Sequence, residues 1–239
     1  MQFRQLIEDL RTMTRMPLVT VNLMLEETKG NDPFFERVVR DFYAETRQRN
    51  RRFPLIRRWQ YGVALCELPA SFDEYFMLIE AAARRNYKKA KRNGYAFARI
   101  DPNDYLDDIA AIWQSAEVRQ GRMPAHFVEG RVRPYTNPPS RSNVHDYPYF
   151  GVVKAGRLVA YAGNLVGGEL FMIEQIFGHA AHQADGVVPM LIIGMAGYML
   201  ENHPRVRYYG YEMYFGSSPT MRRFKKKFKF LPHTVRWVL

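Results

Sequence analysis

Two glutamates interrupt apolar stretches in the C-terminal half of the chain and are the first candidates for chemistry. Glu174 lies within the segment 169–177 and Glu212 within 205–215, and both segments have the composition of β-strands. Burial in an apolar strand raises the pKa of a carboxylate towards neutrality, which suits a general base. An ion pair with an arginine across the sheet is the alternative. Tyr214 is a candidate proton donor beside Glu212.

A second candidate site is the turn that joins the strand 169–177 to a helix expected from about Gly186 to Glu201. A strand that enters a helix through a glycine turn presents backbone N–H groups at the helix N-terminus, and these bind phosphate or pyrophosphate. Glycine matters there because a side chain would hold the anion away from the amides. A turn with a purely structural role is the alternative.

Basic residues form two clusters at helical spacing. Arg84, Lys88 and Arg92 repeat every fourth residue, and a second cluster covers 222–229. Each cluster predicts either a phosphate clamp or a solvated helix face. Arg119 and Arg122 precede the Pro- and Asn-rich segment 123–148, which we expect to be a lid or a substrate-binding loop. These two arginines are candidates for holding an acidic substrate group.

Composition narrows the class of protein. The 239 residues carry a net charge of +11, and 47% are hydrophobic, so the chain is expected to fold and to have an anionic partner. Its single cysteine, Cys66, excludes an internal disulfide framework and predicts a buried thiol. His179 and His182 lack a third ligand, so no metal is expected. Without a signal-peptide pattern or a long enough apolar stretch, we predict a cytoplasmic protein with no membrane span.

The periodicity of the chain predicts an α+β fold. In the N-terminal third we expect helices at 3–13, from Pro33 and at 71–92, and strands at 18–25 and 61–68. A short strand at 95–100 and a helix at 106–116 follow. Glycine turns then connect three strands into an antiparallel meander at 149–154, 158–166 and 169–177. The remaining expected elements are the helix 186–201, the strand 205–215, the helix 218–227 and the strand 233–239.

This order, with the turn at its centre, resembles the GNAT acyltransferase superfamily. That superfamily carries Gln/Arg-x-x-Gly-x-Gly/Ala between its fourth strand and the next helix, and Gln183, Gly186 and Val188 take those positions here. The resemblance implies a GNAT-like, mixed and mostly antiparallel twisted sheet flanked by helices over residues 61–239. Residues 1–60 are then a partial α/β extension, read as helix–strand–helix.

A narrower resemblance is to the FemAB-like branch of GNAT proteins. The segment 84–94 looks like the basic helix of that branch, and Phe224-Lys225-x-x-Phe228 looks like its Phe-Lys-x-x-Phe motif. The resemblance implies acetyl-CoA or another acyl-CoA as co-substrate, with its pyrophosphate on a cradle made of Gln183, Ala184, Asp185, Gly186, Val187 and Val188. We add Ile176, Ser218 and Lys225 to the cofactor site and assign Arg84, Lys88, Arg119 and Arg122 to the substrate.

Three functions fit these resemblances. The leading hypothesis is an N-acyltransferase that moves an acyl group directly from acyl-CoA to an amine, with a carboxylate as general base. The second is an aminoacyl-tRNA-dependent transferase that uses the basic helix to bind tRNA. The third is a non-catalytic nucleic-acid-binding protein on a GNAT frame. The exposed edge of such a sheet allows a monomer or a homodimer.

Overall fold

The computed structural model describes residues 12–49, 57, 59–118 and 123–239. Its strands are β1 (Leu18–Asn22), β2 (Tyr61–Glu67), β3 (Ala96–Ile100), β4 (His145–Asp146), β5 (Tyr149–Lys154), β6 (Arg157–Gly167), β7 (Leu170–Gly178), β8 (Tyr208–Met213) and β9 (Leu231–Val238). Its α-helices are α2 (Pro33–Arg47), α3 (Phe72–Leu78), α4 (Ala81–Arg92), α5 (Leu106–Gln114), α6 (Ala125–Val128), α7 (Val187–Asn202) and α8 (Pro219–Lys227). Short 3₁₀ turns are η1 (Leu25–Glu27), η2 (Pro102–Tyr105) and η3 (Ala180–Asp185).

The strands form one mixed sheet. Its order is β1-β9-β2-β8-β7-β6-β5-β3, and β4 pairs with β6. Only β1–β9 and β7–β8 pair in parallel among the described strands, and the remaining pairs are antiparallel. The expected α+β fold with a mostly antiparallel sheet is therefore confirmed. The strand β1 comes from the first sixty residues and forms an edge of this same sheet.

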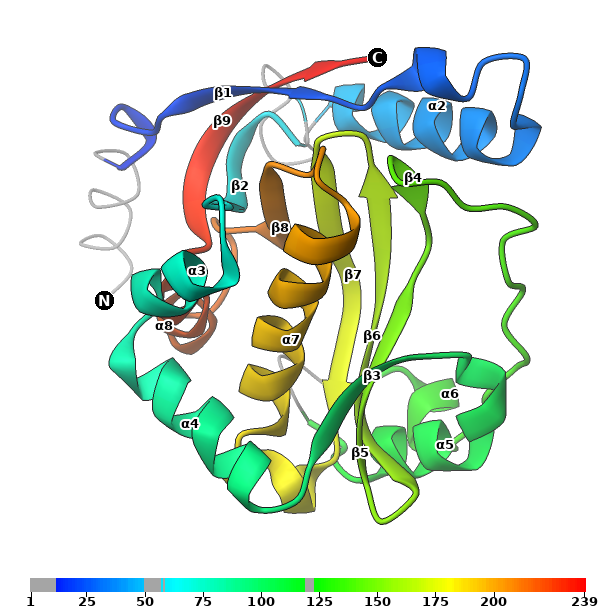
Figure 1. Cartoon of the computed structure of the whole chain (residues 1–239), viewed down its shortest axis with the longest axis vertical. Helices are drawn as coiled ribbons and strands as arrows, with labels where there is room; N and C mark the ends of the chain where they lie inside the picture. Colours follow the sequence, from blue (N-terminus) through cyan, green and yellow to red (C-terminus); the bar gives the residue numbers. More distant parts are fainter. Residues whose placement is uncertain (1–11, 50–56, 58, 119–122) are drawn as a thin grey trace.

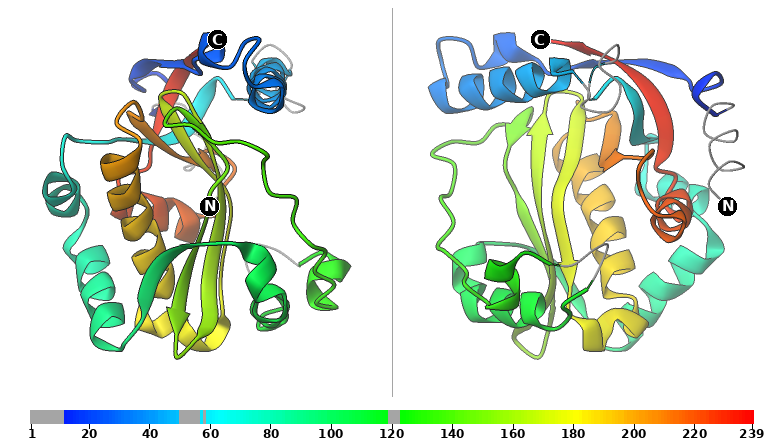
Figure 2. Two further views of the ribbon diagram at one scale, coloured as in Figure 1. Left: turned by 45° about the vertical axis from the view of Figure 1, so that its right-hand side comes forward. Right: turned by 180° about the vertical axis from the view of Figure 1, so that it is seen from behind.

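Helices cover both faces of the sheet (Figure 1). The apolar helix α7 lies against one face with α3 and α4 beside it, while α2, α5 and α6 lie on the other (Figure 2, left). The largest buried cluster lies on the α7 side, a second packs β1 and α2 on the sheet, and a third lies under α5. None of the helices in the described residues combines the length and the apolar character that crossing a bilayer requires.

The expected helix 71–92 is divided into two. The structure ends α3 at Leu78 and begins α4 at Ala81, with Ile79 extended between them. The interruption has a tertiary cause, because the Glu80 amide donates to the carbonyl oxygen of Lys227 at 2.9 Å and the Glu80 carboxylate binds Arg223. Periodicity alone cannot show this contact. The caps predicted at Asp32 and Asp101 are confirmed, since each carboxylate accepts a backbone N–H.

Two irregularities in β7 create room for a site. The strand pairs with β8 only from Leu170 to Met172, so the two strands diverge beyond that point. On its other edge the register against β6 shifts: Ile173 faces Asn164 and Gln175 faces Gly163, which leaves Glu174 as the extra residue of a β-bulge. Bulges re-aim side chains and are common next to active sites.

Candidate functional site

A cavity of about 590 Å³ lies where β7 and β8 diverge. We call it the splay cavity. Its walls come from β7, β8 and the segment after β8, and the N-terminal part of the chain closes one side. The lining residues are Phe42, Glu45, Trp59, Met172, Ile173, Glu174, Glu212, Met213, Phe215, Gly216 and Ser217. Glu174 and Glu212, the two carboxylates predicted from the sequence, therefore share one cavity.

Glu174 occupies the bulge and has the environment of a base. More than a third of its side chain is open to the cavity, but protein surrounds the rest. Burial raises its pKa to about 7, and the negative charge of nearby Glu45 adds to the rise. A carboxyl group with this pKa exchanges a proton near neutral pH, as a general base must. The alternative of an arginine partner finds no support, because no described arginine forms an ion pair with Glu174.

Glu212 faces the cavity from a strained backbone. Its φ of 49° lies in the left-handed region, which a residue with a β-carbon adopts at a cost. Behind it lies Lys225, whose side chain is almost fully buried. The Lys225 ammonium donates to the Met213 carbonyl oxygen at 2.8 Å and stands 4.7 Å from the centre of the Tyr211 ring. Burial lowers the pKa of Lys225 to about 8, and the negative charge of Glu212 opposes this shift.

The N-terminal segment supplies residues that the sequence analysis missed. Glu45 and Phe42 come from α2, and Trp59 precedes β2. The Trp59 indole N–H donates to Glu45 Oε1 at 3.4 Å. A signal was present, because Glu45 lies on the helix face that contains Val38 and Phe42, where a charged residue interrupts the apolar stripe. The sequence does not show which part of the protein α2 packs against, so this signal could not place Glu45 in a site.

Tyr214, Ile176 and Ser218 lie elsewhere. Tyr214 is buried in the main core, with the Arg222 guanidinium 5.6 Å from its ring, so the structure does not place it beside the two glutamates. Ile176 also packs against this core. Ser218 caps α8, since its hydroxyl accepts the Met221 N–H at 3.2 Å. None of the three lines the splay cavity.

The turn expected to hold pyrophosphate is occupied by internal contacts. Asp185 accepts hydrogen bonds from Tyr95 at 2.8 Å and Asn93 at 3.0 Å, and Lys89 lies 3.3 Å from it. The bonds from Tyr95 and Lys89 hold the pKa of Asp185 below its usual value, so the turn carries a negative charge. The Lys89 ammonium also donates to the Ala184 carbonyl oxygen at 2.8 Å.

Gln183 and Ala184 are exposed, whereas the last three cradle residues pack against the protein. The Gly186 amide donates to the Gln183 carbonyl oxygen at 3.1 Å, and Val187 is fully buried. Val188 packs on the end of β7, where a β-carbon on Gly178 would come within 2.7 Å of its methyl group. Pro189 has no N–H to offer in the first turn of α7. The negative charge of Asp185 and the close packing at the start of α7 do not favour binding of coenzyme A pyrophosphate at this turn.

Gly186 has a structural role that can be measured. Its φ is +84°, and an added β-carbon would lie 2.6 Å from the Asn86 carbonyl oxygen of α4. We therefore expect Gly186→Ala to lower the free energy of unfolding by about 2 kcal/mol or more in urea titrations. Gly94→Ala is the matched control. It has a φ of +79° with nothing within 4 Å, and strain alone predicts a loss of about 1 kcal/mol. Equal losses would contradict the close packing of α4 on the turn.

The basic residues of α4 have two kinds of environment, internal and exposed. Arg84 is internal, because its guanidinium donates to the carbonyl oxygens of Phe76, Met77 and Ile79 and so ends α3. The assignment of Arg84 to substrate stays a prediction. Lys88 is exposed, with its ammonium 5.9 Å from the Phe76 ring. Arg119 and Arg122 lie outside the described residues.

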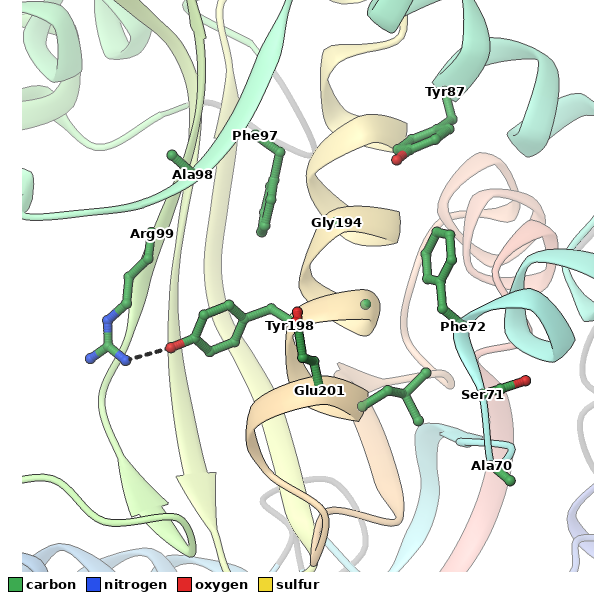
Figure 3. A pocket seen from close by; sticks show the side chains of 12 residues that line it. Ala70, Ser71, Phe72, Tyr87, Phe97, Ala98, Arg99, Gly194, Tyr198 and Glu201 are labelled. Carbon is green, nitrogen blue, oxygen red and sulfur yellow. Dashed lines mark hydrogen bonds between the residues drawn. The ribbon is translucent and has the colours of Figure 1, made fainter.

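A second cavity, of about 680 Å³, is a groove on the outer side of α7 (Figure 3). Phe72 and Tyr87 form one wall, and Phe97 and Arg99 of β3 form the other. The Arg99 guanidinium is held by Asp146 at 2.7 and 3.0 Å and by the Tyr198 hydroxyl at 3.1 Å. The groove contains none of the predicted site residues, and we assign no chemistry to it.

The single cysteine and the possible metal ligands do not provide a second reactive site in the described part of the chain. Cys66 is buried in β2 as expected, and burial raises its pKa to about 12, so the thiol is not a nucleophile at neutral pH. Among the described residues, no three His, Cys, Asp or Glu side chains are grouped in a way that could hold a metal ion.

Comparison with known proteins identifies the fold. No protein-family model matches the sequence, and no curated protein matches it. Among solved structures, FemX is similar with a TM-score of 0.56 and 10% identity over 72% of this chain and 59% of that one. L-PGS from Bacillus licheniformis has a TM-score of 0.45 and 14% identity over 73% and 61%. A tandem GNAT protein from the clavulanic acid biosynthesis pathway has a TM-score of 0.44 and 16% identity over 73% and 50%.

The likeness to FemX carries the assignment. The chain has the GNAT fold, as its sequence predicted, and this fold is typical of acyltransferases. The chain spans 59% of FemX, 61% of L-PGS and 50% of the tandem protein, so their activities are not transferred to it. The narrower resemblance to the FemAB-like branch stays a prediction.

Proposed function

We propose that the protein is an acyltransferase that forms an amide bond with an amine held in the splay cavity. The observation that carries the proposal is Glu174, a carboxylate at a β-bulge that forms no ion pair with a described residue and whose pKa is raised to about 7. A GNAT fold with this feature at the divergence of β7 and β8 supports acyl transfer over simple binding.

The proposed reaction forms one bond, breaks another and moves two protons. The amine nitrogen attacks the carbonyl carbon of an activated ester or thioester, the new C–N bond forms, and the bond to the leaving group breaks. Glu174 takes one proton from the arriving ammonium ion and so leaves a neutral nitrogen to attack. The second N–H proton, lost as the C–N bond forms, goes to the leaving oxygen or sulfur. The buried charge of Lys225, behind the Met213 carbonyl, favours the negative charge that develops on the acyl oxygen.

The charge of the cavity suits an amine. Three carboxylates line it, from Glu45, Glu174 and Glu212, and no lysine or arginine of the described residues does. An amine arrives at neutral pH as an ammonium ion, which carboxylates attract and aromatic rings such as Trp59 also stabilise. Glu45 and Glu212 then hold the cation while Glu174 removes its proton.

Two donors remain as candidates, and the turn at Gly186 weighs against the first. Acyl-CoA would need its pyrophosphate on a turn that carries Asp185 and is closed by α4. The second candidate is aminoacyl-tRNA. It is favoured by Arg85, Lys88, Lys91 and Arg92, exposed cations of α4 that form no ion pair with any residue in the described ranges.

One assay tests the function and the donor together. Purified protein is incubated with a panel of primary amines and either acetyl-CoA or a mixture of aminoacyl-tRNAs, and mass spectrometry detects the amide product. We expect an amide product with aminoacyl-tRNA and none with acetyl-CoA at about 1 mM. A product with acetyl-CoA would overturn the choice of donor. Tight tRNA binding without any product would instead support a non-catalytic nucleic-acid-binding protein.

A further inference from the structure

A third cavity lies next to the splay cavity on the same face of the sheet. We call it the aromatic cavity. Its volume is about 760 Å³, and α5, α6, the segment after α6 and β7 form its walls. The lining residues are Trp113, His126, Phe127, Arg131, Arg133, Pro134, Tyr135, Thr136 and Gln175. Gln175 directly follows Glu174 in the bulge, so adjacent residues of β7 line the two cavities.

The rings of this cavity are held in fixed positions. The Trp113 indole N–H donates to the buried Tyr161 hydroxyl at 2.7 Å, and the Phe127 ring packs with its centre 4.4 Å from that of Trp113. The Tyr135 ring lies 5.1 Å from the Tyr149 ring. Flat, preorganised aromatic walls bind other planar rings with little loss of side-chain entropy.

The charged residues of the cavity have one sign. Both are arginines, and no carboxylate from the described part of the chain lines the cavity. Arg131 forms an ion pair with Glu129, whereas Arg133 is exposed and forms no ion pair with any residue of the described segments. The guanidinium of Arg133 is therefore available for a carboxylate or phosphate. The splay cavity, which contains three carboxylates, has the opposite charge.

We propose that the aromatic cavity binds a planar aromatic ring that carries an anionic group. The ring lies among Trp113, Phe127 and Tyr135, and the anion binds Arg133. The Gln175 amide, 3.5 Å from the Tyr149 hydroxyl, supplies a hydrogen-bonding group at the end next to Glu174. Two kinds of ligand share this chemistry, a nucleoside phosphate and an aromatic carboxylate. The site goes beyond the proposed acyl transfer and does not depend on it.

Titration of the full chain with four probes tests the site. Adenosine 5′-monophosphate and indole-3-acetate have both the ring and the charge, while adenosine lacks the charge and acetate lacks the ring. We expect at least one of the first two to bind with a Kd below about 1 mM by calorimetry, and its uncharged or ring-free counterpart to bind at least about tenfold more weakly. In ¹⁵N NMR spectra, the side-chain amide of Gln175 and the indole N–H of Trp113 should shift.

Variants locate the binding. Arg133→Ala should weaken the bound probe about tenfold, and Arg141→Ala, which removes a cation that lies outside this cavity, should leave its affinity unchanged. Stronger binding of the nucleotide identifies a nucleoside phosphate as the ligand, and stronger binding of indole-3-acetate identifies an aromatic carboxylate. The proposal is wrong if neither binds or if Arg133→Ala has no effect. No acyl donor is present, so this result is independent of the amide-forming assay.

Discussion

Glu174→Gln is expected to lower kcat/KM for amide formation by about 10²- to 10⁴-fold, because the amide cannot take the proton that leaves the attacking amine. In the wild-type protein, Glu174 accepts a proton only when it is ionised. With its pKa near 7, activity should rise with pH through neutrality and then level off. The variant has no group to ionise at this position, so its residual activity should lose that rise.

Two controls separate this chemistry from stability. Glu36→Gln changes a carboxylate of α2 that bonds to Arg40 outside the cavity, and kcat/KM should stay within about twofold of wild type. The thermal midpoint of Glu174→Gln should not fall, because the substitution removes a charge that burial disfavours. A variant that keeps both full activity and the pH rise would show that another group removes the proton.

Much of the fold was predictable because its signals are local. Glycine turns at 156 and 168 predict the meander 149–177. Asp32 and Pro33 predict the start of α2. The divided helix 71–92 was not predictable, because its break depends on the contact of Glu80 with α8, more than a hundred residues away. Local patterns carry no record of such distant partners.

Only part of the site could be predicted, because local signals identify residue types but not their distant contacts. Glu174 and Glu212 stand out as carboxylates in apolar strands, but the bulge that exposes Glu174 depends on its register with β6. Arg84 shows the opposite case. Its place in a basic run predicted a ligand contact, yet its guanidinium ends a neighbouring helix. Charge in a sequence shows that a partner is needed, and only the fold shows whether the protein supplies that partner itself.

The same distinction explains the turn at Gly186. The motif predicts an anion site from residue types alone, and Gln183 and Gly186 fit it, while Val188 stands where glycine or alanine is usual. The anion beside the turn is, however, the protein's own Asp185, held by Tyr95, Asn93 and Lys89. A helix N-terminus that already has a carboxylate nearby gains little from a phosphate. The polar groups around this turn are therefore bonded to one another within the chain.

Lys225→Met is expected to reduce kcat by about 10²-fold while leaving the protein at least as stable. Holding an ammonium with a pKa near 8 in place of 10.5 costs about 3 kcal/mol at neutral pH, and methionine fills a similar volume without that cost. The Met213 carbonyl keeps the Ser217 hydroxyl as a donor at 3.0 Å. The variant loses only the positive charge of Lys225, which lies behind Glu212 and is proposed to stabilise the reacting carbonyl group.

The pH dependence of stability gives an independent check on Lys225. Because its pKa is lowered on folding, the unfolded chain binds more protons between about pH 8 and 10.5, and the wild-type free energy of unfolding gains a rising contribution across that range. Lys225→Met lacks this contribution, so its stability advantage in urea titrations should shrink as the pH increases. Lys226→Met, on the exposed side of the same helix, should change neither kcat nor this trend. Normal turnover in Lys225→Met would mean that the buried charge serves packing alone, since no other lysine reaches the Met213 carbonyl among the described residues.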